Sequence, residues 1–307
     1  MDPTPEIAMD SPQQLDTAGL FDARYTAFLE TITHLRPQLH RYCARMTGSA
    51  MDGEDVMQEA VFEAYRKLDQ FDDSRALAPW LFRIAHNRCI DFLRRREVRE
   101  QAEAAAAEPD LALPPEPSGQ ALGTAVERLV IHLPPKERAC VLLKDVFDYS
   151  LEETAELVDS TVGGVKAALN RGRAKLAASP PPKAPPAPAP ELLRLLQLYV
   201  ERFNRHDWHG LRELISADAR LRVADCFAGR FGDSPYLAEY KRYAAIWRMV
   251  LATVDGEAVA LLLRETAAGW VPAAPVRFVM RDGRLERIVD FFKCPWVLEA
   301  AESVELS

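Results

Sequence analysis

WLFRIAHNRCIDFLRRR, residues Trp80 to Arg96, is a helical pattern with two different faces. At 3.6 residues per turn, one face is apolar and consists of Leu81, Phe82, Ala85, Cys89, Phe92 and Leu93. The other face consists of Trp80, Arg83, Asn87, Asp91 and Arg94. Guanidinium, amide and indole groups suit contacts with phosphates and nucleobases. The alternative is a solvated basic face on an ordinary core helix.

Length and composition limit the classes of protein to which the chain can belong. Its 307 residues are enough for about two or three domains, and 46 acidic against 38 basic residues give a formal charge of −8. Such an acidic body contacts nucleic acid only through local basic faces. The five cysteines are scattered without a CxxC pair, which fits reduced thiols. Because the chain shows neither a signal peptide nor an apolar run of membrane-spanning length, we expect a cytoplasmic protein without membrane contact.

Two His and Cys pairs repeat one spacing. His40 precedes Cys43, and His86 precedes Cys89, each by three residues, so two helices could present four zinc ligands. Ordinary helix packing also explains both pairs and is far more common. We therefore expect no metal site, and no motif in the chain indicates a cofactor.

Apolar periodicity divides the chain into three domains and their connections. The segment SPPPKAPPAPAP can only form an extended spacer, and the Pro- and Ala-rich segment before residue 121 is a second linker. The predicted organisation is a mobile tail at 1–20, a helical domain at 21–96, a linker at 97–120, a second helical domain at 121–178, the Pro-rich linker at 179–190 and a third domain at 191–307.

The helix predicted at residues 54–68, EDVMQEAVFEAYRKL, turns Asp55, Gln58 and Glu59 away from its apolar face. Phe62 lies among these polar residues, with no obvious core to join. An exposed aromatic side chain can occur without a function. An aromatic residue surrounded by charges is also typical of a protein-docking hot spot.

A capping box predicts a helix at residues 151–157, because Ser150 is followed by Glu153. The next predicted helix runs from Val162 to Leu176. The polar residues that it displays are Lys166, Asn170, Arg171, Arg173 and Lys175. Two short helices joined by a tight turn, with the second one basic, have the form of a helix-turn-helix, although many helical hairpins that do not bind DNA share it.

Beyond residue 190 the periodicity changes from helical to alternating. The helical segment ELLRLLQLYVERFNRHDWHGLRELI is followed by apolar runs that Asp-Gly turns separate at 255–256 and 282–283. Such turns are typical of antiparallel strands. We therefore predict a multidomain protein in which two all-α domains precede an α+β domain.

Residues 1–178 resemble an extracytoplasmic-function (ECF) sigma factor of bacterial RNA polymerase. Four segments carry the resemblance in order and spacing, namely EDVMQEAVFEAY, PWLFRIAHNRCIDFLRRR, LPPKERACVLLKDVFDYSLEETAELV and VKAALNRGRAKL. The resemblance implies that core RNA polymerase binds Asp55, Gln58, Glu59 and Phe62. It also implies that sigma region 2, the first helical domain, binds and opens the minus-ten promoter element through Trp80, Arg83, Asn87, Arg88, Arg94, Arg95 and Arg96.

The same resemblance makes the second helical domain sigma region 4, with its basic helix in the major groove of the minus-thirty-five element. The residues nearest the promoter DNA would be Thr161, Val162, Lys166, Asn170, Arg171 and Arg173. The chain departs from the usual pattern at Gly163, Gly164, Ala167 and Ala168. Base readout would therefore depend on fewer side chains.

From Glu191 onward the chain resembles a SnoaL-like domain, the cone-shaped α+β fold of ketosteroid isomerases and polyketide cyclases. YVERFNRHDWHGLRELISADARL and GRLERIVDFF carry this resemblance. It implies a pocket for a small-molecule ligand, with Trp208, Tyr236, Trp247 and Asp290 as candidate lining residues. Asp290 would be the carboxylate of an active site; the alternative is a strand-end residue that faces solvent or forms a salt bridge with an arginine.

Three hypotheses follow for the whole chain. The first is a sigma factor without catalytic residues, in which the SnoaL-like domain contacts the sigma domains and regulates promoter-specific initiation. The second is an isomerase or cyclase tethered to DNA-binding domains. The third is a C-terminal interaction module that sequesters the sigma domains.

Overall fold

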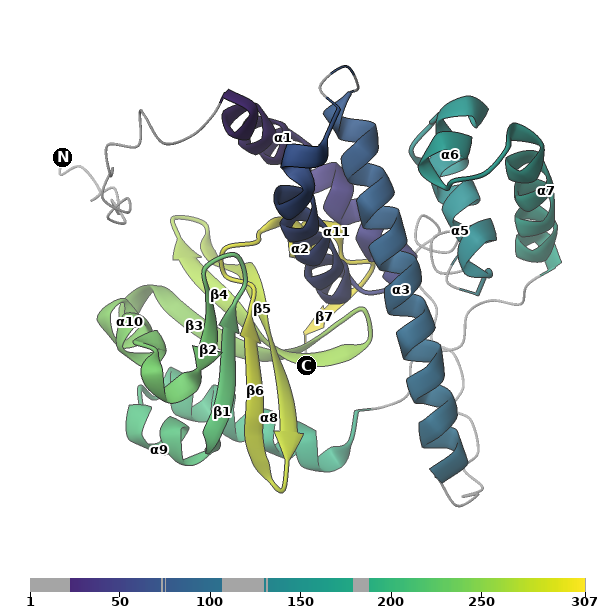
Figure 1. Ribbon diagram of the computed structural model, residues 1–307. Coiled ribbons are helices and arrows are strands. Elements are labelled where there is room, and N and C mark those ends of the chain that lie inside the picture. The colour runs from purple at the N-terminus through teal and green to yellow at the C-terminus, as the bar shows by residue number, and fades with distance from the viewer. Residues whose placement is uncertain are drawn as a thin grey trace.

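The computed structural model describes residues 23–72, 74, 76–106, 130, 132–178 and 188–306 (Figure 1). We refer to residues 23–106 as the first helical domain, to residues 130–178 as the second helical domain and to residues 188–306 as the C-terminal domain. The predicted tail at 1–20 lies outside the described residues, as do most of the two predicted linkers.

Three helices make up the first helical domain: α1 at Ala23–Thr47, α2 at Ala50–Lys67 and α3 at Leu77–Ala106, with a short 3-10 helix, η1, at Leu68–Gln70. Ser49 is the N-cap of α2, because its hydroxyl accepts a 3.2 Å hydrogen bond from the backbone amide of Asp52. The apolar face predicted for α3 is buried over its first part. Its residues Leu81, Phe82, Ala85 and Cys89 are all at most 2% exposed.

Helix α3 is longer than the sequence analysis predicted. It continues past Arg96 to Ala106, so the first part of the segment expected to be a linker, 97–120, is helical (Figure 1). The linker was predicted from the absence of an apolar period. Ala and Glu have high intrinsic helix propensity, however, and they favour continuation of a helix without any core to pack against.

The second helical domain contains α5 at Pro135–Val141, the π-helical turn η2 at Leu142–Val146, α6 at Leu151–Leu157 and α7 at Val162–Ala178. The predicted capping box is present at the start of α6. The Ser150 hydroxyl accepts from the Glu153 amide at 3.1 Å, and the Ser150 amide donates to the Glu153 carboxylate at 2.7 Å. Since a short turn joins α6 to α7, the predicted helix-turn-helix is confirmed.

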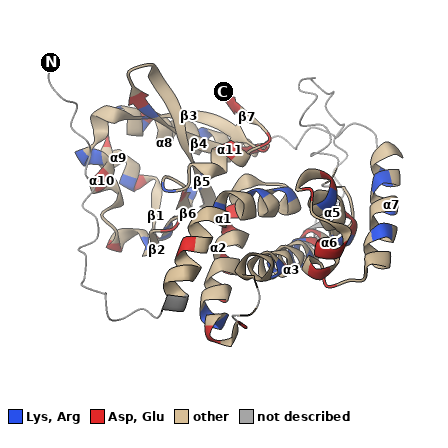
Figure 2. Ribbon diagram, turned by 90° about the horizontal axis from the view of Figure 1, so that it is seen from above, with Lys and Arg blue, Asp and Glu red and all other residues tan. Residues whose placement is uncertain are grey.

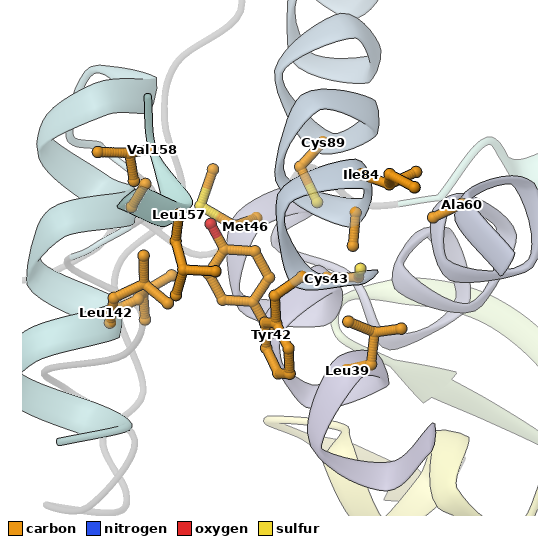
Figure 3. Close-up of a cluster of buried hydrophobic side chains, with 14 of the residues drawn as sticks. Leu39, Tyr42, Cys43, Met46, Ala60, Ile84, Cys89, Leu142, Leu157 and Val158 are labelled. Carbon is orange, nitrogen blue, oxygen red and sulfur yellow. The ribbon is translucent and has the colours of Figure 1, made fainter. Parts of the chain in front are cut away.

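The two helical domains share one hydrophobic core. Tyr42 of α1 meets Phe147 edge-on, with the ring centroids 6.0 Å apart. Figure 3 shows Tyr42 and Met46 of α1 facing Leu142 and Leu157 of the second helical domain. Burial of these side chains stabilises the contact between the two domains.

The C-terminal domain is α+β, as predicted. Its helices are α8 at Pro190–Asn204, α9 at Trp208–Glu213, α10 at Tyr236–Arg242 and α11 at Trp296–Ala300, with 3-10 helices at Phe231–Asp233 and Ala244–Ile246. Its strands are β1 at Ile215–Val223, β2 at Phe227–Arg230, β3 at Trp247–Val254, β4 at Glu257–Thr266, β5 at Gly269–Arg281, β6 at Arg284–Asp290 and β7 at Val304–Leu306. The strands form one sheet in the order β2-β1-β6-β5-β4-β3-β7. Strands β1 and β6 pair in parallel, and the other neighbours are antiparallel.

Both Asp-Gly turns predicted from the sequence join antiparallel strands. Asp255 and Gly256 connect β3 to β4, and Asp282 and Gly283 connect β5 to β6. All four residues have positive φ angles, between 52° and 80°. Gly and Asp tolerate this backbone region better than most residues do, which is why the dipeptide predicts these tight turns.

The sheet is covered on both faces. Helices α8, α9 and α10 cover one face with a core that includes Leu196, Phe203 and Phe278. The core on the other face, which α11 covers, also includes Ala50 and Met51 from the start of α2. The first helical domain therefore contributes side chains to the hydrophobic core of the C-terminal domain.

Gly53 lies where α1 and α2 approach each other closely. A Cβ atom at this position would lie 2.5 Å from both the backbone N and the Cα of Ala44, so Gly53→Ala would force the helices apart. We expect the free energy of unfolding to fall by about 1 to 3 kcal/mol, measured by urea denaturation of the full chain. Gly163→Ala in α7 is the matched control, because its nearest neighbour would lie 3.9 Å away. A Gly53→Ala protein as stable as the unchanged chain would contradict the close packing.

Candidate functional site

The C-terminal half of α2 presents two of the predicted docking residues to solvent. Phe62 is 60% exposed, and the guanidinium carbon of Arg66 lies 4.7 Å from its ring centroid. Glu59 is also exposed, with its carboxylate 3.6 Å from Arg95 of α3. An aromatic side chain with charged neighbours is suited to docking a protein partner.

Asp55, in the N-terminal half of α2, is paired within the chain. Its Oδ1 accepts from the guanidinium of Arg222 on β1, and its Oδ2 lies 3.8 Å from Arg277 on β5. Arg277 also donates to Asp52 at 2.8 Å and to Glu257 at 2.6 Å. Burial lowers the pKa of Arg277, but the charges of Glu257 and Asp52 outweigh it and leave the pKa raised. Electrostatic attraction therefore holds α2 against the sheet.

Glu54 forms a buried link between the same two domains. Its carboxylate accepts a 2.6 Å hydrogen bond from the indole of Trp296 on α11 and a 2.7 Å hydrogen bond from the amide of Gln58. The thiol of Cys294 lies 3.4 Å from Glu54 Oε1, and His40 Nε2 lies 3.9 Å from Oε2. Since a buried carboxylate without donors is costly, these contacts make Glu54 an anchor for α11.

Two further contacts attach the turn between α1 and α2 to the C-terminal domain. Arg45 donates to the backbone carbonyl of Ala300 at 3.0 Å, and the carboxylate of Asp255 accepts from the backbone amide of Ala50 at 2.7 Å. Neither contact was predicted from the sequence. Arg45 lies in a helix and Asp255 in a turn, and a charged residue there has the same sequence pattern whether solvent or another domain lies beyond it.

The predicted promoter-opening face of α3 is partly accessible. Asn87 is exposed, and the side chain of Arg94 is 77% exposed. Arg83 is half-buried. Trp80 is also half-buried and packs on Phe71, with the ring centroids 4.8 Å apart. The structure therefore leaves Asn87 and Arg94 accessible, whereas the indole of Trp80 is partly used in packing.

The other predicted arginines of α3 have carboxylate partners. Arg88 forms an ion pair with Glu63, and Arg96 donates to Glu100 at 2.7 Å. Together with the pair between Arg95 and Glu59, these contacts hold the guanidinium groups along the helix. Contact with DNA would exchange these carboxylates for phosphates.

At the start of α7, Thr161 acts as a cap, because its hydroxyl accepts a 3.0 Å hydrogen bond from the amide of Gly164. Val162 is half-buried beside it. Lys166 and Asn170 are exposed one and two turns further along the helix. These two polar side chains are therefore available to a ligand of the helix.

Three basic residues of α7, among them Lys175, pair with acidic residues of α5 and η2 instead. Arg171 donates to Glu137 at 2.9 Å, and Arg173 donates to Asp145 at 2.6 Å. Figure 2 shows basic residues along α7 and acidic residues gathered on α6. The basic side chains that gather on α7 are therefore partly neutralised by Glu137 and Asp145.

Of the four candidate pocket residues, the structure brings Tyr236 and Asp290 into contact. One carboxylate oxygen of Asp290 accepts from the hydroxyls of Tyr236 at 2.8 Å and Tyr240 at 2.6 Å, and the other accepts from the amide of Phe292 at 2.8 Å. Burial raises the pKa of Asp290, although these three hydrogen bonds oppose it. Asp290 is 1% exposed, so the expectation of a solvent-facing residue is wrong, and among the described residues no arginine forms a salt bridge with it.

Trp208 and Trp247 make different contacts. Trp208 meets Phe203 at 5.6 Å between ring centroids, and Trp247 meets Phe292 at 5.1 Å. Both tryptophans pack against the main hydrophobic core of the C-terminal domain. Their large aromatic surfaces therefore stabilise the fold.

The two His and Cys pairs lie in the core of the helical domains. His86 Nδ1 is 2.9 Å from the hydroxyl of Tyr42, and His40 Nε2 is 2.9 Å from the carbonyl of Ala50. Within the described ranges, no group of three or more His, Cys, Asp or Glu side chains could hold a metal ion. No helix among the described residues is both long enough and apolar enough to cross a membrane.

Two family models match the helical domains: Sigma-70 region 2 over residues 31–99, and Sigma-70, region 4 over residues 124–176. Over 162 residues the chain is 32% identical to the ECF RNA polymerase sigma factor SigW of Bacillus subtilis. The aligned region covers 49% of this chain and 87% of SigW. Over 213 residues the chain is 32% identical to the ECF RNA polymerase sigma factor SigG of Mycobacterium tuberculosis. That aligned region covers 60% of this chain and 58% of SigG. The two domains thus define a transcription-initiation protein. The chain belongs to the ECF sigma factors, which direct RNA polymerase to promoters.

Solved structures similar to the chain include a sigma factor and a smaller single domain. The sigma factor SigJ of Mycobacterium tuberculosis is 19% identical, with a TM-score of 0.33, over 87% of this chain and 97% of SigJ. A putative polyketide cyclase from Pseudomonas putida is 19% identical, with a TM-score of 0.26, over 35% of this chain and 95% of the cyclase.

His86 of α3 provides a pH test of the packed helical core. Burial and the positive charge of Lys136 on α5 lower its pKa from 6.5 to about 4. At a pH between these two pKa values, His86 binds a proton in the unfolded chain but not in the folded chain. The free energy of unfolding therefore falls as the pH falls through this range. We expect a loss of about 2 kcal/mol between about pH 7 and about pH 5, measured by urea denaturation. His86→Gln should reduce this pH dependence; an unchanged slope would contradict the role of His86.

Proposed function

We propose that this sigma factor docks on core RNA polymerase through α2, contacts the minus-ten element through α3 and the minus-thirty-five element through α7, and is restrained by its C-terminal domain. The pairing of Asp55 with Arg222 carries the proposal. The family resemblance assigns Asp55 to polymerase docking, and one carboxylate cannot serve both partners at once. The C-terminal domain therefore competes with polymerase for α2.

The competition involves only part of the docking surface. Asp55 and Gln58 are half-buried in contacts within the chain. Phe62 is exposed, and so is Glu59, whose partner Arg95 lies on the neighbouring helix of the same domain. Polymerase can therefore make its first contact with the exposed half of α2 while the C-terminal domain still holds Asp55. Complete docking then requires release of the sheet from α2.

The shared core of the helical domains also opposes promoter binding, because it holds the two DNA-binding domains together. The two promoter elements are centred about 25 base pairs apart, which is about 85 Å of duplex at 3.4 Å per base pair. The two helical domains, in contrast, are in direct contact: the ring centroids of Tyr42 and Phe147, one from each domain, are 6.0 Å apart. Simultaneous binding of both elements therefore requires this core to open.

We assign no catalytic role to the C-terminal domain. A general base needs an accessible lone pair within hydrogen-bond reach of its substrate. Both carboxylate oxygens of Asp290 already accept hydrogen bonds from the protein. This arrangement supports a structural role for Asp290 over the isomerase or cyclase hypothesis, and the interface with α2 supports a regulatory role for the domain.

Arg222→Ala combined with Arg277→Ala tests the proposed restraint. The change removes the partners of Asp52 and Asp55 and leaves α2 unaltered. A coupling of about 1 to 3 kcal/mol would correspond to about a 5- to 150-fold shift towards the open form. We therefore expect more run-off transcript from core polymerase at limiting sigma concentration. Arg248→Ala, an exposed arginine of β3, is the control. Equal or lower transcript from the double variant would refute the restraint.

Arg94→Ala combined with Arg95→Ala tests the proposed opening face of α3. Both side chains are more than half exposed, so their loss should leave the fold intact. Loss of two phosphate contacts should slow promoter opening and reduce the salt dependence of binding by about two units of slope. Permanganate footprinting of the melted strand measures opening directly. Normal opening by a folded double variant would exclude this face as the opening surface.

A further inference from the structure

Two arginines lie side by side on the α11 face of the sheet, at positions that α11 and α2 leave exposed. The parallel register of β1 and β6 pairs Arg220 with Arg287, and both side chains are exposed. Neighbouring strands are about 4.8 Å apart, so the two guanidinium groups start from adjacent backbone positions. Within the described parts of the chain, no carboxylate lies within 4 Å of either guanidinium. The pair is therefore a local excess of positive charge that the fold leaves uncompensated.

Arg222 extends this pair towards α2. It lies two residues beyond Arg220 on β1, hence on the same face of the sheet, and its neighbour in register is Val289. Burial, the positive charge of Arg277 and, more weakly, that of Arg287 lower the pKa of Arg222. We call Arg220, Arg222 and Arg287 the arginine strip. One of its three members holds Asp55, and the other two face solvent.

We propose that the arginine strip binds a short polyphosphate, such as the phosphate tail of a nucleotide. Guanidinium groups bind phosphate oxygens through paired hydrogen bonds, and several adjacent phosphates would relieve the repulsion among the three arginines. The strip lies on two adjacent strands, because Arg230 of β2, opposite Arg220 in register, is paired with Asp218. Helix α2 borders the strip at Arg222. This width fits a chain of a few phosphates better than a duplex.

Such a ligand would also act on the interface with α2. A phosphate group at Arg222 would compete with the carboxylate of Asp55, because both accept from the same guanidinium. Polyphosphate binding would then weaken the hold of the C-terminal domain on α2. This consequence rests on the proposed restraint of α2, whereas binding to the strip can be measured without it.

Isothermal titration of the full chain with inorganic tripolyphosphate tests the binding site. We expect saturable binding that becomes at least tenfold weaker in Arg220→Gln combined with Arg287→Gln. Arg248→Gln, an exposed arginine elsewhere on the sheet, should bind as the unchanged chain does. Absence of saturable binding, or equal binding by the double variant, would overturn the proposal. Tighter binding of a short DNA duplex through the same two arginines would also overturn it.

A second measurement separates this proposal from the restraint itself. Hydrogen exchange of the α2 amides should accelerate when tripolyphosphate is added to the full chain, and the Arg220→Gln and Arg287→Gln double variant should not respond. If tripolyphosphate binds but Arg222→Ala combined with Arg277→Ala leaves transcription unchanged, the site stands and the restraint fails. If that variant raises transcription but tripolyphosphate does not bind, the restraint stands and the site fails.

Discussion

The ion pairs between α2 and the sheet of the C-terminal domain determine how the whole chain can act. Asp52 and Asp55 on one helix meet Arg222 and Arg277 on two strands. The side chains of the Asp55 and Arg222 pair are still 32% and 28% exposed. Partly exposed pairs contribute modestly and are screened by salt, so a partner with a larger surface can replace them. The same carboxylates can thus serve a resting contact and a polymerase contact in turn.

The buried part of the interface gives this contact its geometry. Glu54 receives hydrogen bonds from Trp296 and Gln58 away from solvent, and Met51 packs into the apolar core below the sheet. Removal of a buried carboxylate's partners is costly, so these contacts favour one fixed position of α11 on α2. Release of the C-terminal domain is therefore expected to be cooperative: the exposed ion pairs and the buried anchor separate together.

Much of the fold could be predicted from local signals. The capping box at Ser150 and both Asp-Gly turns specify backbone geometry within a few residues, and the structure confirms them. The exposed position of Phe62 also followed from helical spacing. The partners of Asp55 could not be predicted in this way. An arginine on the outer face of a strand is compatible with solvent, a ligand or another domain. Only the packing of the two domains, which brings together Asp55 and Arg222 from positions 167 residues apart in the chain, decides among them.

Fluorescence energy transfer between the C-terminal domain and α2 tests the central claim most directly. Cys226 is exposed in the turn between β1 and β2, and it can carry one dye. A cysteine introduced at the exposed Gln70, in the 3-10 helix that directly follows α2, carries the other. The ion-paired arrangement predicts high transfer in the free protein and a marked decrease when core RNA polymerase binds. Unchanged transfer in a polymerase complex that has formed would contradict competition for α2.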